Sequence, residues 1–297
     1  MSAMDEDRAR RAMVSLRGLA LGDGFGQRCL EAPGEVGPGG QWRLPEGRWR
    51  FTDDTEMACS VYAVLRGRGH VDQDALAAGF AARFDPGRGY GPATAGVLAS
   101  VRAGGDWREL AGGLFGGAGS FGNGAAMRVA PLGAWFSDDV EEAARQAALS
   151  AAVTHTHPEG VAGAVAVAVG AAVAARREAL GAPAFLDEVL AHVPAGEVSE
   201  GVRAARALLV VSDPVAVGRE LGCGQRISAQ DTVPFTLWCA AKHLDGFPAA
   251  VWETARAGGD ADTTCAIVGG VVATRVPGGR LPQEWVSHGE PLPQWVV

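Results

Sequence analysis

The sequence has no excess of positive charge, no paired cysteine motif and no segment with the alternating pattern of a β-strand. Its 26 Lys and Arg residues are outnumbered by 34 Asp and Glu residues, which gives a formal net charge of -8 at pH 7. A general nucleic-acid-binding protein needs a basic surface to neutralise phosphates. The composition therefore argues against that class of protein.

The cysteines are few and unpaired in the sequence. They form no CxxC motif, and none of them stands next to a histidine. Disulfide frameworks and zinc sites usually show even numbers of cysteines or closely spaced Cys and His residues. We therefore expect free thiols in a reducing, cytoplasmic compartment and no zinc site. The five residues are Cys29, Cys59, Cys223, Cys239 and Cys265.

Neither a secretion signal nor a membrane span is evident. Residues 1–11 carry charges of both signs and lack the apolar core of a signal peptide. Residues 160–175 are uncharged, but this run is short for a membrane span and rich in Ala and Gly. We expect a buried central helix there, no membrane association and a cytoplasmic protein.

Helical periodicity dominates what the sequence does contain. Hydrophobic residues make up 47% of the 297 residues and no linker or repeat divides them, so we expect one all-α domain over residues 1–297. The glycines in residues 22–26 are expected to end a first helix, and a long Gly/Pro-rich loop should follow at about 27–51. The predicted helices are 8–21, 53–65, 72–83, 93–103, 106–112, 125–135, 137–152, 160–176, 202–211, 214–221, 233–243, 248–257 and 262–274.

Two groups of Asp and Thr stand where apolar helices are expected to begin. We call Thr52-Asp53-Asp54-Thr55 the first acidic cluster and Asp260-Ala261-Asp262-Thr263 the second acidic cluster. Such residues often cap a helix by accepting hydrogen bonds from its free backbone amides. Ser137-Asp138-Asp139 fits this ordinary role because charged residues follow it, whereas both acidic clusters run into apolar residues.

The acidic clusters bring together more carboxylates than capping requires. Ionised carboxylates withdrawn from water repel one another unless protons or cations neutralise them. Carboxylate and hydroxyl oxygens are hard ligands that favour Mg²⁺ or Mn²⁺ over Zn²⁺. Four aspartates can hold two such ions, which would make a bound water more acidic and orient a substrate hydroxyl.

A glycine-rich loop at residues 119–124, Gly-Ser-Phe-Gly-Asn-Gly, precedes another expected helix. Its free amides, with Ser120 and Asn123, could bind a diphosphate, and the ring of Phe121 could contact a base or ribose. A simple glycine-rich turn with Phe121 in the core is the structural alternative. His155 could contact a bound ligand. Arg128 follows the loop closely, but it could form a structural ion pair instead of contacting the ligand.

Five segments in order resemble the motifs of the ADP-ribosylglycohydrolases, including those of the dinitrogenase reductase-activating glycohydrolase type. Their order and spacing match from about residue 13 to residue 275. The segments are Gly22-Asp23, the first acidic cluster, residues 119–128, Thr154-His155 and Gly259 with the second acidic cluster.

The resemblance implies an all-helical fold around a binuclear Mg²⁺ or Mn²⁺ centre. Such an enzyme hydrolyses the bond at the anomeric ribose carbon and releases ADP-ribose from protein side chains or other ADP-ribosylated acceptors. The implied metal ligands are Thr52, Asp53, Asp54, Asp260, Asp262 and Thr263. The implied catalytic residues are Glu31, Asp53, Asp54 and Asp262, and the implied substrate contacts are Ser120, Phe121, Gly122, Asn123, Gly124 and His155.

Two alternatives to this function stay open at the level of sequence. A two-metal phosphohydrolase uses similar carboxylates, and some relatives bind ADP-ribose without catalysis. The motifs also leave open the acceptor, which could be arginine, serine or an ADP-ribose polymer. They leave open the identity of the proton carrier, the choice between Mg²⁺ and Mn²⁺, and the oligomeric state.

Overall fold

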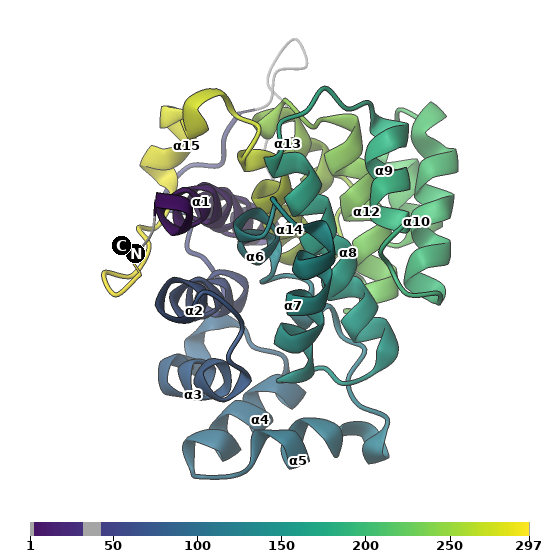
Figure 1. Ribbon diagram of the computed structural model, residues 1–297. Coiled ribbons are helices and arrows are strands. Elements are labelled where there is room, and N and C mark those ends of the chain that lie inside the picture. Colours follow the sequence, from purple (N-terminus) through teal and green to yellow (C-terminus); the bar gives the residue numbers. More distant parts are fainter. Residues whose placement is uncertain (1–2, 32–42, 297) are drawn as a thin grey trace.

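The computed structural model describes residues 3–31 and 43–296, and within these residues the chain forms helices and no sheet (Figure 1). This confirms the expected all-α class. In Figure 1, α3, α4 and α5 form one end of the molecule, and α9 and α10 lie on the other side of α8. The α-helices are α1 Ala3–Glu31, α2 Asp53–Arg68, α3 Gln73–Arg83, α4 Pro92–Arg102, α5 Trp107–Gly112, α6 Ala130–Trp135, α7 Val140–Ala152, α8 Pro158–Ala175, α9 Ala182–Leu190, α10 Glu197–Ala207, α11 Pro214–Leu221, α12 Ala229–Lys242, α13 Phe247–Arg256, α14 Ala261–Ala273 and α15 Gln283–His288. The short 3-10 helices are η1 Pro86–Arg88, η2 Leu114–Gly117, η3 Asn123–Ala125, η4 Leu208–Val210 and η5 Pro277–Gly279.

The first helix is longer than the sequence predicts. It continues through residues 22–26 and ends at Glu31, so the expected stop at the glycines is wrong. Residues 27–31 accordingly belong to α1 and not to the loop predicted at about 27–51. From the sequence, Trp42 and Trp49 of this predicted loop could cover a substrate or anchor the loop. Trp42 lies outside the described residues.

Close packing of α1 on α14 explains why glycines are tolerated inside α1. Gly18, Gly22 and Gly26 are four residues apart and so lie on one face of the helix. A Cβ atom at Gly22 would overlap the carbonyl oxygen of Cys265, and one at Gly26 would overlap that of Ala261. The backbones of the two helices therefore lie in direct contact, and this packing outweighs the low helix propensity of glycine.

The most apolar helix, α8, lies in the core. By length and composition it is the one helix in the described part of the chain that could cross a membrane, but 83% of it is buried inside the protein. Ala164, Val167 and Ala171 have no exposed surface. The prediction of a buried central helix is confirmed.

Most other predicted helices form with the expected caps. Thr52 is the N-cap of α2, and Gly69 ends that helix in the left-handed conformation. The helices α9 and α15 were not predicted, because short apolar segments flanked by Gly and Pro resemble loops. Residues 208–210 form the 3-10 helix η4.

An aromatic cluster joins the C-terminal helix to α1 and to the segment before α2. The rings of Phe25 and Trp285 stack at a centroid distance of 4.7 Å, and Trp49 meets Phe25 edge-on at 5.2 Å. Trp49 is fully buried and therefore anchors this segment; it does not cover a substrate.

Candidate active site

The first acidic cluster forms the N-terminal turn of α2. Thr52 caps the helix: its hydroxyl accepts a hydrogen bond from the Asp54 amide and lies 3.0 Å from Asp54 Oδ2. Asp53 lines the adjacent cleft, whereas the carboxylate of Asp54 is buried behind it. The helix start thus orients the two neighbouring carboxylates differently.

The second acidic cluster forms the N-terminal turn of α14. Gly258 and Gly259 both have φ of 73°, and this left-handed turn delivers Asp260 to the N-cap position. The side-chain Nδ2 of Asn123 donates a hydrogen bond to Asp260 Oδ2 at 2.7 Å. The turn therefore sets the positions of the carboxylates that follow it.

A contact between the two clusters shows that they form one site. The hydroxyl of Thr263 donates to Asp54 Oδ2 at 3.4 Å, across a separation of 209 residues in the sequence. Asp262 lines the same cleft as Asp53. The structure thus brings the two clusters to the same place.

A fully buried carboxylate, Asp23 of α1, supports the first cluster from behind. It accepts hydrogen bonds from the amide and hydroxyl groups of both Thr52 and Thr55, at distances of 2.5 to 3.1 Å. Burial raises the pKa of Asp23 to about 6, although these hydrogen bonds act in the opposite direction. Asp23 ties α1 to the turn that carries the first cluster.

Burial and mutual repulsion disfavour ionisation of the carboxylates in the site. Burial, followed by the charge of Asp23, raises the pKa of Asp53 to about 8. Burial and the nearby Asp260 raise that of Asp262 to about 8. Burial raises the pKa of Asp54 well above its ordinary value, with Asp23 and Asp53 adding to the effect. Positive charge placed among these groups would relieve both penalties.

The donor set fits a hard divalent cation. Asp54 Oδ1 and Asp262 Oδ1 are both buried without a hydrogen-bond partner among the described residues, so each has a free acceptor. Threonine hydroxyls and further carboxylate oxygens surround them. Over residues 3–31 and 43–296, however, no three His, Cys, Asp or Glu side chains are arranged as a ready-made metal site. The fit rests on the chemistry of the donors and on the two free oxygens.

The glycine-rich loop lies on a second segment, residues 227–229. The Phe121 carbonyl accepts a hydrogen bond from the Ala229 backbone amide at 2.9 Å. The backbone amide of Asn123 donates to the Ile227 carbonyl at 3.3 Å. The side chain of Asn123 also reaches Thr232. Phe121 is 46% exposed, which excludes the alternative that it belongs to the core.

His155 lies directly beneath this loop. A Cβ atom at Gly124 would come within 2.9 Å of the imidazole, so the loop needs glycine there to pack on the ring. The ring Nδ1 lies 2.7 Å from the Thr154 hydroxyl. Burial, with a smaller effect of the Arg128 charge, lowers the pKa of His155 to about 3. The imidazole is therefore neutral around pH 7.

Arg128 has no ion-pair partner among the described residues, although an ion pair was considered from the sequence. It is fully buried and donates to the Thr154 hydroxyl at 2.9 Å and to the Ser150 carbonyl at 2.7 Å. Its guanidinium lies over the ring of Phe80, 4.7 Å from the ring centroid. Burial lowers the pKa of Arg128 to about 9. Its contact with Thr154 makes it a support for His155.

A cleft of about 370 Å³ collects most of the predicted residues. Glu31 is not among the described residues that line it; this carboxylate is 55% exposed at the end of α1, 3.5 Å from Arg28. Its catalytic role stays a prediction. Thr52 and Asp54 lie behind the cleft wall. The predicted residues that line the cleft are Asp53, Ser120, Phe121, Gly122, Asn123, Gly124, His155, Asp260, Asp262 and Thr263.

Sequence reasoning missed two apolar side chains of the cleft, Phe115 and Ile227. They are 65% and 63% exposed, and both have positive φ, which is uncommon for residues other than glycine. Strained backbone of this kind often marks ligand sites. The glycines around Phe115 were a usable signal for an exposed ring, and Gly222 and Gly224 were a usable signal for the loop that carries Ile227.

Comparisons with known proteins give the family of the chain. The model of the ADP-ribosylglycohydrolase family matches residues 4–295. An uncharacterized protein of Archaeoglobus fulgidus is 30% identical over 287 residues, covering 91% of this chain and 88% of the relative. ADP-ribosylhydrolase ARH3 of Bos taurus is 30% identical over 277 residues, covering 81% and 74%. A solved structure, an ADP-ribosylglycohydrolase-related protein complex, matches with a TM-score of 0.61 and 26% identity, covering 96% of this chain and 94% of that one.

Proposed function

Because the chain belongs to the ADP-ribosylglycohydrolase family, we propose that it hydrolyses the glycosidic bond at the anomeric ribose carbon of ADP-ribosylated substrates in a metal-dependent reaction. The products are ADP-ribose and the free acceptor, which is a protein side chain or a related group. Several relatives carry the name ADP-ribosylhydrolase, which supports this class of reaction.

One observation carries the proposal: two acidic clusters from distant parts of the chain meet at one cleft and leave two buried carboxylate oxygens without hydrogen-bond partners among the described residues. Bound Mg²⁺ or Mn²⁺ would offset the repulsion of the carboxylates and supply Lewis-acid chemistry for a water and the ribose hydroxyls. The residues proposed to hold two such ions are Thr52, Asp53, Asp54, Asp260, Asp262 and Thr263.

Other residues that line the cleft provide the elements that would bind ADP-ribose. The glycine-rich loop offers backbone amides and Ser120 for the diphosphate. Phe115, Phe121 and Ile227 offer exposed apolar surface for the adenine base. The ribose would then lie between this loop and the acidic clusters, with its anomeric carbon near the carboxylates.

Glycosidic cleavage needs a group that protonates the leaving acceptor and a group that accepts a proton from water. Asp53 and Asp262 line the cleft, while Asp54 is held behind it by Thr52 and Thr263. We therefore assign proton transfer to the carboxylate oxygens of Asp53 or Asp262 and a structural, ion-holding role to Asp54.

The substitution Asp262→Asn tests the assignment, since it keeps the shape of the side chain and removes the charge. We expect release of ADP-ribose from an ADP-ribosylated protein to fall by more than the roughly 10- to 100-fold typical of losing an outer-shell partner of a metal. Calorimetry with Mn²⁺ should show weaker binding, while circular dichroism still reports a helical protein.

The matched control is Asp138→Asn, an exposed aspartate in a similar Asp-Asp sequence at the start of α7. Its turnover and Mn²⁺ affinity should equal those of the wild type. Mass spectrometry of the products distinguishes the reactions: phosphate or nucleotide release from a phosphoester would indicate a phosphohydrolase. Undiminished turnover in Asp262→Asn, or full activity in chelator, would refute the proposal.

A further inference from the structure

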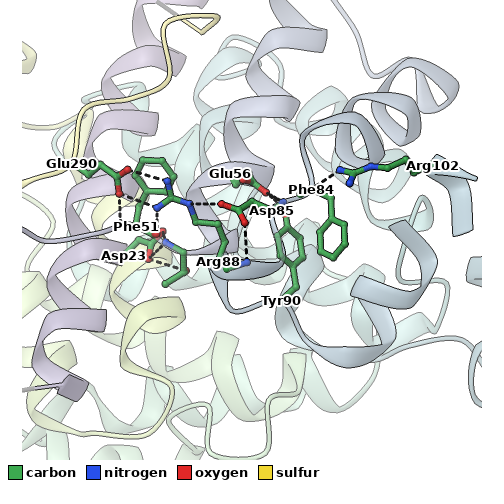
Figure 2. A network of polar contacts seen from close by, with 11 residues as sticks. Asp23, Phe51, Glu56, Phe84, Asp85, Arg88, Tyr90, Arg102 and Glu290 are labelled. Atoms are coloured by element: carbon green, nitrogen blue, oxygen red, sulfur yellow. Dashed lines mark hydrogen bonds and ion pairs between the residues drawn. The ribbon is translucent and has the colours of Figure 1, made fainter. Parts of the chain in front are cut away.

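Phe51, the residue just before the first acidic cluster, is held by both of its backbone polar groups (Figure 2). Its amide donates to Glu290 Oε2 at 3.3 Å, and its carbonyl accepts from Arg88 Nη1 at 2.8 Å. Both partners are far from Phe51 in the sequence. The peptide groups on either side of Phe51 are thus fixed by side chains and by no helix or sheet.

The two side chains that hold Phe51 also hold each other. Arg88 and Glu290 form a bidentate pair with two nitrogen to oxygen distances of 2.9 Å, and only 14% and 22% of their side chains are exposed. The Arg88 guanidinium lies 4.0 Å over the ring of Phe51. Planar bidentate pairing restricts both side chains to one geometry. We call these two residues and their contacts with Phe51 the clamp.

Other contacts fix the segments that supply the clamp. The carboxylate of Glu56 on α2 accepts hydrogen bonds from the Tyr90 hydroxyl at 2.6 Å and from the Asp85 amide at 3.1 Å, and so holds the loop that carries Arg88 (Figure 2). The Glu290 amide donates to the Trp49 carbonyl at 3.0 Å. The clamp is therefore tied to α2 through Glu56 and to the segment before α2 through Trp49.

The position of Phe51 matters because the first acidic cluster follows it directly. Asp23 already fixes Thr52 from the side of α1, so Thr52 lies between Asp23 and the clamp. The clamp loop also supplies Gly89 and Gly91 to the cleft wall next to Asp53. Ligands of a cation must be held to within roughly 0.5 Å of their working positions. A shift of Phe51 would move the cluster out of that range.

We propose that Arg88 and Glu290 are positioning residues, which hold Phe51 so that the first acidic cluster can bind a divalent cation. This inference rests on the proposed function, because it assumes that the cluster binds a cation. Neither Arg88 nor Glu290 is among the described residues that line the cleft. Both therefore act through the backbone of Phe51 and not through the substrate.

The test measures binding of Mn²⁺ alone, by calorimetry, to the full chain and to Arg88→Met and Glu290→Gln. Both substitutions roughly preserve side-chain size and remove one half of the pair. We expect each variant to bind Mn²⁺ about tenfold more weakly, as is typical when an outer-shell partner of a metal is lost. The double variant should lose little more than either single variant, since both residues act through one structure.

Arg102→Met is the matched control, because Arg102 also joins a loop to a helix. It donates to the carbonyls of Ala81 and Phe84 at 2.7 Å and has no contact with Phe51. We expect this variant to lose some thermal stability and to keep the wild-type Mn²⁺ affinity. An affinity unchanged in Arg88→Met and Glu290→Gln would overturn the clamp proposal, even if both variants melt at a lower temperature.

The outcomes separate this inference from the proposed function. A wild-type protein that binds no Mn²⁺ would refute the cation site itself, whatever the variants do. Wild-type binding that the Asp262→Asn variant weakens and the clamp variants leave unchanged would support the site and refute the clamp. If Arg88→Met does not fold, the near-isosteric Glu290→Gln variant decides the question.

Discussion

At the scale of single residues, the site is built from ionisable side chains whose burial opposes folding. The carboxylates of buried Asp54 and half-buried Asp53 and Asp262 repel one another, and the imidazole of His155 is held where it cannot easily carry a proton. Such departures from ordinary folding rules are expected at functional sites. Their effect on stability can therefore be used to test how the site is arranged.

Burial of His155 predicts a specific pH dependence of stability. The unfolded chain takes up a proton at His155 near pH 6.5, but the folded protein does not do so until the pH approaches about 3. The unfolded state binds more protons in this interval, so the free energy of unfolding should fall as the pH is lowered from 6.5. The His155 contribution is at most about 1.4 kcal/mol per pH unit. Urea unfolding of wild type and His155→Gln between pH 7 and 5 should show a shallower slope for the variant.

The exposed residue His70 supplies the control for this experiment. Other groups of the site also titrate in the same interval, and the comparison of wild type with each variant removes their contribution. The profile of His70→Gln should run parallel to that of the wild type. If the profile of His155→Gln is parallel as well, the imidazole is not buried in the neutral form that the structure shows.

At the scale of elements, the contact between α1 and α14 positions both acidic clusters. The glycine face of α1 lies on the backbone of α14, whose first turn carries the second cluster, and Asp23 on α1 holds the first cluster. The distance between these two helices is therefore part of the geometry of the site. Any group that separates them should act on the stability of the fold and on the cleft together.

Gly22→Ala tests this contact. The added Cβ atom would overlap the backbone carbonyl of Cys265, which cannot move as a flexible side chain would. We expect a loss of about 1 to 3 kcal/mol or more in the free energy of unfolding, as for other overpacked cores. Gly96→Ala on α4 is the control, because no atom lies within 4 Å of the added group there and alanine favours helix. Urea unfolding that shows equal stability for both variants would contradict the close contact.

The same pair of helices shows what the sequence could and could not predict. Periodicity and capping residues were sufficient for α2 and α14, and motifs were sufficient to group the two acidic clusters. The extension of α1 through Gly22 was missed, because local propensity favours a stop and only packing against Cys265 overrides it. The clamp was also missed, since no spacing rule connects Arg88 with Glu290 before the fold brings them together.

At the scale of the whole molecule, the C-terminal segment completes the fold around the start of α2. Glu290 belongs to the clamp, and Trp285 of α15 contacts Phe25 of α1 and Trp49 of the segment before α2. The last part of the chain thus packs against its first helix and against the segment that leads into the site. Loss of this packing should lower the stability of the protein as a whole.

Trp285→Ala measures how much the packing of this C-terminal segment contributes to the stability of the protein. The indole is 3% exposed and lies among Phe25, Trp49 and Phe247, so its removal leaves a large cavity. We expect the free energy of unfolding to fall by about 3 to 5 kcal/mol. Trp295→Ala, at a 43% exposed position of the same C-terminal segment, should change it by no more than about 1 kcal/mol. Because α15 holds the segment leading to the first acidic cluster, Trp285→Ala should also weaken Mn²⁺ binding. Two variants of equal stability would show that the C-terminal helix is an accessory to the fold and not part of its core.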